Sequence, residues 1–193
     1  MDTDANDSLA GTLRAMVGCL EQAQMAYLVI GGIAQAVLGE PRTTQDVDCI
    51  VAIQPSDIVW LFDALQAAGF TVNRTEAQQR VEMFGTFRVT RGHWRVDVIV
   101  ASTEFERSAF SRSQRLRLYG MELNLPTPED FIILKLVPGR DKDLLDAKIV
   151  FARHRQRLNL DYMKQWAQRL SDEAEDIRIW QLYQRLITAS DES

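Results

Sequence analysis

Two aspartates separated by one residue are the first feature of the chain that suggests chemistry. Asp46 and Asp48 flank Val47 at the start of an apolar stretch, residues 47–53, that has the pattern of a buried β-strand. Residues i and i+2 of a strand point to the same face, so the two carboxylates are expected side by side. Adjacent carboxylates repel each other, and a hard divalent cation such as Mg²⁺ removes that repulsion because it prefers oxygen ligands. The spacing predicts a metal site; the alternative is an aspartate pair that only caps a turn.

A glycine pair precedes the aspartates by thirteen residues. Gly31 and Gly32 follow a short apolar run, residues 27–30, which predicts a strand leading into a tight turn and a short helix over 33–38. Glycines let backbone N–H groups approach a ligand closely, and the N-terminus of the following helix favours anions such as phosphate. A tight turn without a ligand is the alternative. We expect the two motifs together by chance in roughly a few chains per thousand.

A third acid is needed if two metal ions are to be held. Asp97 is the best candidate because it lies within an otherwise apolar strand, residues 94–101, where an acid needs a reason. Its alternative is a salt-bridged aspartate, with Arg95 as the nearest partner. Glu82 and Glu104 are poorer candidates because they lie nearer to the ends of their segments.

The remaining elements must position these residues. Ser8 is the expected cap of the first helix, and Thr127 followed by Pro128 has the pattern of another helix start. The order of the elements predicts an α/β (α+β) protein, with a core over residues 1–126 and a helical region over 127–193 packed on it. The expected segments are helices over 8–23 and 57–68, a hairpin of extended runs 81–90 and 94–101, a strand over 122–125, a helix ending at 138–139, and helices from 141 onward with breaks near 159 and 171.

Composition excludes several classes of protein. The chain has 193 residues, of which 46% are hydrophobic and 25% charged, and this excludes disordered and collagen-like chains. No apolar run approaches the roughly 20 residues that cross a bilayer, and the polar N-terminus lacks the pattern of a secretory signal. Two cysteines in apolar segments, Cys19 and Cys49, fit buried thiols. We therefore expect a cytoplasmic protein without a membrane partner.

Charge bears on nucleic-acid partners. The net charge of −5 disfavours a protein that coats nucleic acid without sequence preference. Residues 107–117 nevertheless contain four arginines and no acid, which mildly favours contact with RNA. A solvated helix face is the alternative for this segment.

Together, these residues resemble the nucleotidyltransferase superfamily related to DNA polymerase β. The family pattern is a hydrophobic residue before Gly-Gly or Gly-Ser, then two acids separated by one hydrophobic residue, then a third carboxylate on a later strand. Here these are Ile30-Gly31-Gly32, Asp46-Val47-Asp48 and Asp97. The residues Arg42-Thr43-Thr44-Gln45 before Asp46 resemble the R-x-T-x-D-x-D form of a small bacterial subset. The resemblance implies a mixed sheet flanked by helices.

A second segment resembles AbiEii-like and related uncharacterised nucleotidyltransferases, which include toxins of toxin–antitoxin pairs. Its residues are Lys135, Gly139-Arg140, Lys142, Asp143 and Asp146. In this interpretation Lys135, Arg140 and Lys142 reach triphosphate oxygens, and the two aspartates, which share a helix face, orient them. The alternative is that Lys135 extends to solvent from an apolar helix and the rest is a capped helix start.

The resemblance implies a metal-dependent transfer of a nucleoside monophosphate from a nucleoside triphosphate, such as ATP, to a hydroxyl. Asp46, Asp48 and Asp97 would be the catalytic residues and the ligands of Mg²⁺ or Mn²⁺. Nucleotide contacts would come from Gly31, Gly32, Arg42, Thr43, Lys135, Arg140, Lys142 and Asp146.

The acceptor is left open among an RNA 3′ end such as that of tRNA, a protein hydroxyl and a small molecule such as an antibiotic. A cognate toxin or antitoxin protein is a further expected partner. Two other hypotheses compete with an active enzyme. One is a nucleotide-binding regulatory module without transfer, and the other is a structural partner in which the aspartate pair is coincidental.

Overall fold

The computed structural model describes residues 8–188, which fall into two compact units. The first unit comprises the chain up to Ile33 and from Thr43 to Leu125, and the second comprises Ala34–Arg42 and the chain from Pro126 onward. The N-terminal stretch that bears on a secretory signal lies outside the described residues. No helix within residues 8–188 is long and apolar enough to span a bilayer.

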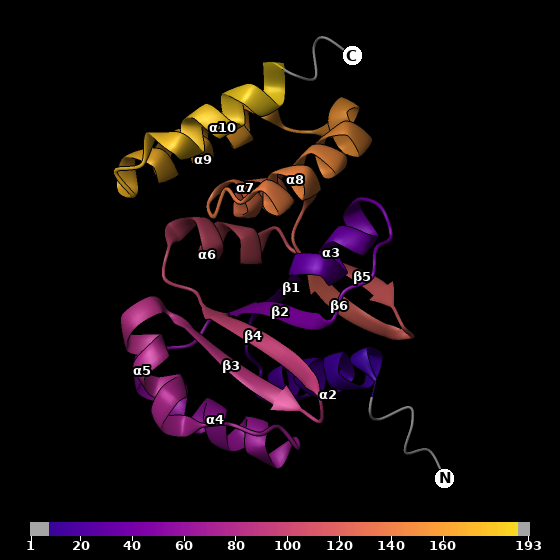
Figure 1. Cartoon of the computed structure of the whole chain (residues 1–193), viewed down its shortest axis with the longest axis vertical. Coiled ribbons are helices and arrows are strands. Elements are labelled where there is room, and N and C mark those ends of the chain that lie inside the picture. The colour runs from indigo at the N-terminus through magenta and orange to yellow at the C-terminus, as the bar shows by residue number, and fades with distance from the viewer. Residues whose placement is uncertain (1–7, 189–193) are drawn as a thin grey trace. The chain divides into compact units, whose positions relative to one another are not determined.

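A four-stranded mixed sheet is the centre of the first unit (Figure 1). β2 and β4 are parallel, whereas β1–β2 and β3–β4 are antiparallel pairs. This sheet and its helices confirm the predicted α/β class. In spatial order the strands are β1 (Tyr27–Ile30), β2 (Asp46–Val51), β4 (Trp94–Val100) and β3 (Thr86–Arg91).

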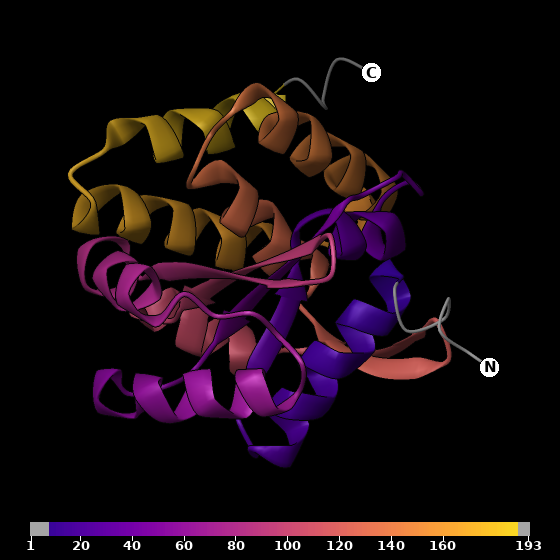
Figure 2. The same cartoon turned by 60° about the horizontal axis from the view of Figure 1, so that its bottom comes forward.

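Helices α2 (Leu9–Gln22) and α4 (Ile58–Ala67) lie together on one side of the sheet (Figure 2). The predicted start of α2 is confirmed, since the Ser8 side chain accepts a hydrogen bond from the backbone N–H of Gly11. Alternate residues of the central strands, such as Val47 and Val96, are fully buried. The opposite face begins with Asp46 and Asp48, so the strands present an apolar face to the core and a charged face at one end.

The extended run predicted over residues 81–90 is wrong in its first half. Residues Arg74–Phe84 form helix α5, and strand β3 begins only at Thr86. Asn73 caps the helix by accepting from Glu76 N, and Gly85, at φ 64°, ends it. Only Ala77 of α5 is buried, so the helix has almost no apolar periodicity from which the sequence could indicate it.

The arginine-rich segment contains two elements that the sequence did not indicate. Helix α6 (Glu104–Ser111) starts with a capping box between Thr103 and Glu106, and strand β5 (Gln114–Leu118) pairs with β6 (Met121–Leu125). The latter strand confirms the one expected over 122–125.

Helices make up the second unit. The predicted helix start at Thr127 is confirmed, because its hydroxyl accepts from Asp130 N and Pro128 occupies the first turn. The breaks near Asn159 and near Ser171 are also confirmed; the second falls over residues 174–176, where the Ser171 hydroxyl donates to the carbonyl of Asp176. The helices are the end of α3 (Gly31–Leu38), α7 (Pro128–Leu136), α8 (Asp141–His154), α9 (Leu160–Glu173) and α10 (Ile177–Thr188), with a 3₁₀ turn over Arg155–Arg157.

Candidate functional site

Strand register brings the three predicted carboxylates onto one face of the sheet. In the parallel pair β2–β4, Asp48 lies opposite Asp97 and Asp46 lies opposite Arg95. Residues paired in this way point to the same face, and Asp46 and Asp48 share that face because they are two residues apart. The side chains of Asp46 and Asp97 are 33% and 35% exposed, so a ligand from solvent can reach them.

The glycine pair packs directly against this aspartate strand. A Cβ on Gly31 would overlap the Oδ2 atom of Asp48, and one on Gly32 would come 2.5 Å from the hydroxyl of Thr44. Gly31 also has φ +63°, a left-handed conformation that glycine adopts without strain. The glycine and aspartate motifs therefore form one sterically linked structure, because no larger residue fits at either glycine without moving its neighbour.

Two arginines bind two of the three carboxylates. Arg88 donates from Nε and Nη2 to the two oxygens of Asp97 at 2.6 and 2.9 Å. Arg95 donates in the same way to Asp46 at 2.8 and 3.3 Å. Arg95 therefore binds Asp46, and the aspartate that it was expected to pair with, Asp97, is bound by Arg88. The hydrogen bonds and charge of Asp97 raise the pKa of Arg88, and Asp46 and Asp48 add to this effect.

The Cys49 thiol follows Asp48 on β2 and lies on the opposite, buried face of the strand. The pKa of Cys49 is raised by burial and by the charges of Asp48 and Asp97. Cys19 is buried as well, so both cysteines are the buried free thiols that the sequence predicted.

The three carboxylates offer the oxygen ligands that a hard cation prefers. Within residues 8–188, no three His, Cys, Asp or Glu side chains stand ready to enclose a metal ion. The chemistry of the donor set nevertheless fits Mg²⁺ or Mn²⁺, since Asp46, Asp48 and Asp97 supply only oxygen atoms on an open face. The two arginines occupy oxygens that such a cation would need.

A second charged cluster lies in the second unit and gathers four charged residues around a nearly buried lysine. The Nζ atom of Lys135 lies 3.0 Å from Asp143 and 2.9 Å from Asp146. Arg140 donates to the other oxygen of Asp143 at 2.5 Å, and Arg42 donates to Asp146 at 3.2 Å. The side chains of Lys135, Asp143 and Asp146 are only 12%, 1% and 7% exposed. Lys135 therefore does not extend to solvent, which was the alternative interpretation of this residue.

The charges of this cluster stabilise one another. Burial alone would raise the pKa of Asp143, but hydrogen bonds from Arg140 and Lys135 outweigh it and lower the pKa. Three cations and two carboxylates leave one net positive charge. Arg140 and Arg42 lie on the outside of the cluster, with side chains 62% and 44% exposed.

The other two predicted nucleotide contacts take part in neither set of ion pairs described above. Lys142 is exposed in the first turn of α8, and Thr43 is exposed before β2. Thr44 instead contacts the site, since its hydroxyl donates to the carbonyl of Asp46 at 3.2 Å and packs on Gly32. Thr44 precedes Asp46 by two residues. This spacing in the sequence was the available signal that Thr44, rather than Thr43, lies at the site.

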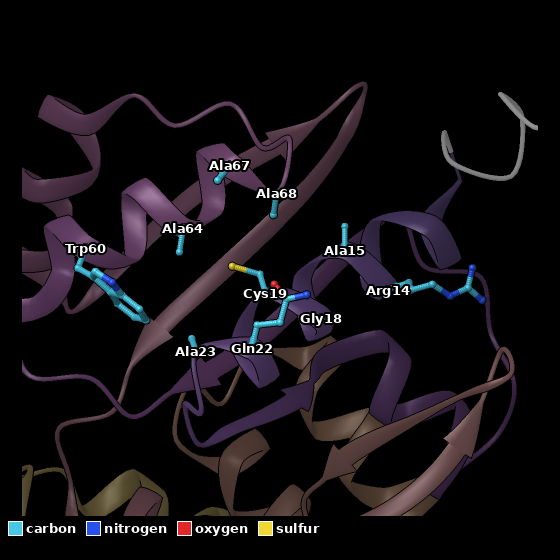
Figure 3. A pocket seen from close by; sticks show the side chains of 10 residues that line it. All are labelled: Arg14, Ala15, Gly18, Cys19, Gln22, Ala23, Trp60, Ala64, Ala67 and Ala68. Atoms are coloured by element: carbon cyan, nitrogen blue, oxygen red, sulfur yellow. The ribbon is translucent and has the colours of Figure 1, made fainter.

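A separate hollow of about 520 Å³ lies between α2 and α4 (Figure 3). Trp60 lies at one end of it and Arg14 at the other, and Cys19 points into it. The remaining lining is largely small side chains, including Ala15, Ala64, Ala67 and Ala68. The lining contains no carboxylate, so the hollow lacks the chemistry of the aspartate site.

A family model matches most of the chain. The model is described as "Nucleotidyltransferase of unknown function (DUF6036)" and covers residues 9–190. No curated protein is significantly similar to the chain in sequence.

Solved structures with a similar fold include two antibiotic-modifying enzymes. The antibiotic-resistance factor ANT(2'')-Ia in solution has a TM-score of 0.56 and 12% identity, over 100% of this chain and 96% of that one. Its crystal structure with adenylyl-2''-tobramycin gives 0.55 and 12%, over 91% and 97%. The lincosamide antibiotic adenylyltransferase LnuA, bound to lincomycin, gives 0.50 and 11%, over 72% and 93%. At these identities the likeness shows a common fold.

Proposed function

The chain belongs to the nucleotidyltransferase family described as DUF6036, and on this premise we propose that it transfers a nucleoside monophosphate from a nucleoside triphosphate to a hydroxyl of a small molecule. The observation that carries the proposal is the strand register that sets Asp48 opposite Asp97, beside the glycine pair at Gly31. That arrangement puts carboxylates next to a backbone turn suited to phosphate.

Asp46, Asp48 and Asp97 are the residues that would hold a divalent cation. Such a cation neutralises phosphate charge and lowers the pKa of a bound hydroxyl. Asp97 is the carboxylate assigned to the acceptor, where it accepts the hydroxyl proton as the α-phosphorus is attacked and pyrophosphate leaves. The backbone N–H groups at Gly31 and Gly32 are proposed to bind the phosphates, because glycine lets a ligand approach the backbone closely and helix α3 begins at Gly31.

The cluster around Lys135 is proposed to bind the triphosphate through its outer residues. Asp143 and Asp146 fix Lys135 in place, and the exposed guanidiniums of Arg42 and Arg140 carry donors that match phosphate oxygens. The net positive charge of the cluster supports this role. Thr43 and Lys142 are proposed as weaker contacts because both are exposed.

The arginine-rich segment, residues 107–117, was expected to favour RNA, but the ion pairs of Arg115 weaken that argument and favour a small-molecule acceptor. Arg115 is bound by Glu21 at 3.2 Å and by Glu122 at 2.8 Å, so acids from outside the segment neutralise part of its charge. Binding of an RNA end needs such cations for its phosphates. The fold shared with the two antibiotic adenylyltransferases agrees with a small acceptor and with ATP as the donor.

The test is transfer from each of the four α-³²P nucleoside triphosphates, with Mg²⁺ or Mn²⁺, into three separate pools. The pools are an antibiotic and metabolite mixture, total RNA, and lysate protein. The Asp46→Asn/Asp48→Asn protein removes two ligands, and Asp172→Asn, an exposed aspartate of α9, is the matched control.

Label in the small-molecule pool that is absent only from the double variant supports the proposal. Label in RNA or protein would reassign the acceptor, and would reopen a toxin–antitoxin role. Metal-dependent nucleotide binding without any label would favour the regulatory module, and absence of both would favour a structural partner.

A further inference from the structure

Arg88 and Arg95 have no role in the proposed transfer, yet each makes a two-pronged contact with a carboxylate assigned to the metal. We propose that these two arginines compete with the divalent cation for Asp97 and Asp46, holding the site in a metal-free form and leaving the oxygens when the cation binds. This inference rests on the proposed function because it takes the three aspartates as the metal ligands.

The geometry of the contacts makes the two occupants mutually exclusive. Arg88 contacts both oxygens of Asp97, and Arg95 contacts both oxygens of Asp46. Such paired contacts direct the planar fork of a guanidinium at the open edge of a carboxylate. A cation that binds the carboxylate from this edge needs the same oxygen lone pairs, so it has to displace the arginine.

Strand register builds these contacts into the sheet. Arg88 of β3 lies directly opposite Asp97 of β4, and Arg95 of β4 lies directly opposite Asp46 of β2. Each arginine therefore starts from the same face as its aspartate, on the neighbouring strand. In agreement with this placement, the hydrogen bond and charge of Asp97, and then the charges of Asp46 and Asp48, raise the pKa of Arg88.

Exposure sets the strength of the competition. The side chains in both pairs are between 33% and 52% exposed, and ion pairs exposed to this degree shift an equilibrium by at most about fivefold. That is enough to weaken cation binding measurably and too little to prevent it. The arginines therefore remove the mutual repulsion of the carboxylates in the metal-free protein without closing the site.

Mn²⁺ titration of the full chain, followed by the EPR signal of free Mn²⁺ without nucleotide, tests the competition. We expect Arg88→Met and Arg95→Met each to tighten Mn²⁺ binding about three- to fivefold. Arg74→Met is the matched control, because Arg74 is an exposed arginine of the same unit paired with Asp63, which is not part of the site. It should leave the affinity unchanged.

The Arg88→Lys variant separates competition for oxygens from a simple effect of charge. It keeps the positive charge but loses the fork, so we expect part of the gain seen with Arg88→Met. Wild-type affinity in Arg88→Lys, or in both Met variants, would overturn the inference while leaving the metal site intact. Absence of Mn²⁺ binding by the wild type, or equal binding by Asp48→Asn, would instead contradict the metal site of the proposed function.

A direct readout follows the guanidinium groups during a Mg²⁺ titration. The arginine Nε–Hε signals in ¹H–¹⁵N NMR spectra, assigned with the same variants, should shift for Arg88 and Arg95 as Mg²⁺ binds. The Arg74 signal should stay in place. Mg²⁺ binding that leaves the Arg88 and Arg95 signals unmoved would show that the arginines keep their carboxylates, and would overturn the inference.

Discussion

Gly31 and Asp48 approach each other so closely that a single methyl group on Gly31 would overlap the Asp48 carboxylate. The antiparallel register of β1 and β2, which pairs Ile30 with Asp48, produces this contact. Glycine at position 31 is therefore required by the position of the carboxylate as well as by any contact with phosphate.

The Gly31→Ala variant is expected to lose cation binding and transfer together. The new Cβ has to push the Asp48 side chain aside, and the left-handed backbone at φ +63° costs about 1 kcal/mol or more for alanine. Gly120→Ala is the matched control, since Gly120 has φ +75° and open space around an added Cβ. It should show only the backbone cost in thermal unfolding and keep full Mn²⁺ affinity. Equal Mn²⁺ affinity in both variants would show that the contact with Asp48 is unimportant.

The Lys135→Met variant is expected to destabilise the protein by about 3 kcal/mol. It leaves the buried carboxylates of Asp143 and Asp146 without their shared cation, and removal of one partner from a buried pair is costly. Arg140→Met, which removes an exposed partner of the same Asp143, should cost about 1 kcal/mol or less. Urea denaturation compares the two. A Lys135→Met protein of wild-type stability but weakened nucleotide binding would assign the lysine to the ligand alone.

Acid is expected to weaken the same cluster. Because the pKa of Asp143 is lower in the folded protein than its ordinary value of 3.8, its charge stabilises the fold above that value and this contribution is lost as the pH falls further, through the folded pKa. Asp143→Asn should therefore lower the free energy of unfolding near neutral pH, and the gap to wild type should narrow below about pH 4. Urea denaturation from pH 7 to pH 3 measures the gap, with Asp172→Asn as an exposed control. A gap that stays constant across this range would contradict the prediction.

Two neighbouring threonines are expected to differ in what they do. Thr44→Val removes a hydrogen bond to the Asp46 carbonyl and should cost about 1 kcal/mol of stability. Thr43→Val should leave stability unchanged, because Thr43 is exposed, and should raise the KM for the nucleoside triphosphate if Thr43 contacts it. Unfolding curves and initial rates separate the two effects. Unchanged KM in Thr43→Val would remove this residue from the proposed binding set.

Local sequence patterns predicted the glycine and aspartate motifs, but they did not predict which residues of other elements lie next to these motifs. Two glycines after an apolar run predicted the strand that ends just before Gly31, and two aspartates at the start of another run predicted the strand that carries Asp46 and Asp48. The placement of Asp48 opposite Asp97 depends on a parallel register between strands about fifty residues apart, and no local pattern encodes it. The partners of Lys135 were expected to lie near it but not to enclose it, because the apolar pattern of α7 gives no sign of charged groups packed against it.

Arg88 is a different kind of omission, because a signal for it was present. The turn predicted near Gly92 pairs Arg91 with Trp94, and counting back three positions on each strand pairs Arg88 with Asp97. The strand predicted from residue 81 begins only at Thr86, but this difference at its far end does not change the pairing counted from the turn. The resemblance of the segment from Lys135 to Asp146 to AbiEii-like proteins stays a prediction.

The short turn between β3 and β4 has a consequence for protein engineering. An exposed hairpin tip with a glycine is normally a permissive place for insertions. Here the tip also determines that Arg88 faces Asp97. Lengthening the tip by one residue, with β4 kept in place, would shift β3 by one residue and turn Arg88 to the apolar face of the sheet. The length of this tip is thus constrained by the pairing of Arg88 with Asp97, which lies three residues along each strand from the closing pair Arg91–Trp94, or about 10 Å at roughly 3.3 Å per residue. Loop grafting at Gly92 would change the metal response of the site before it changed the fold.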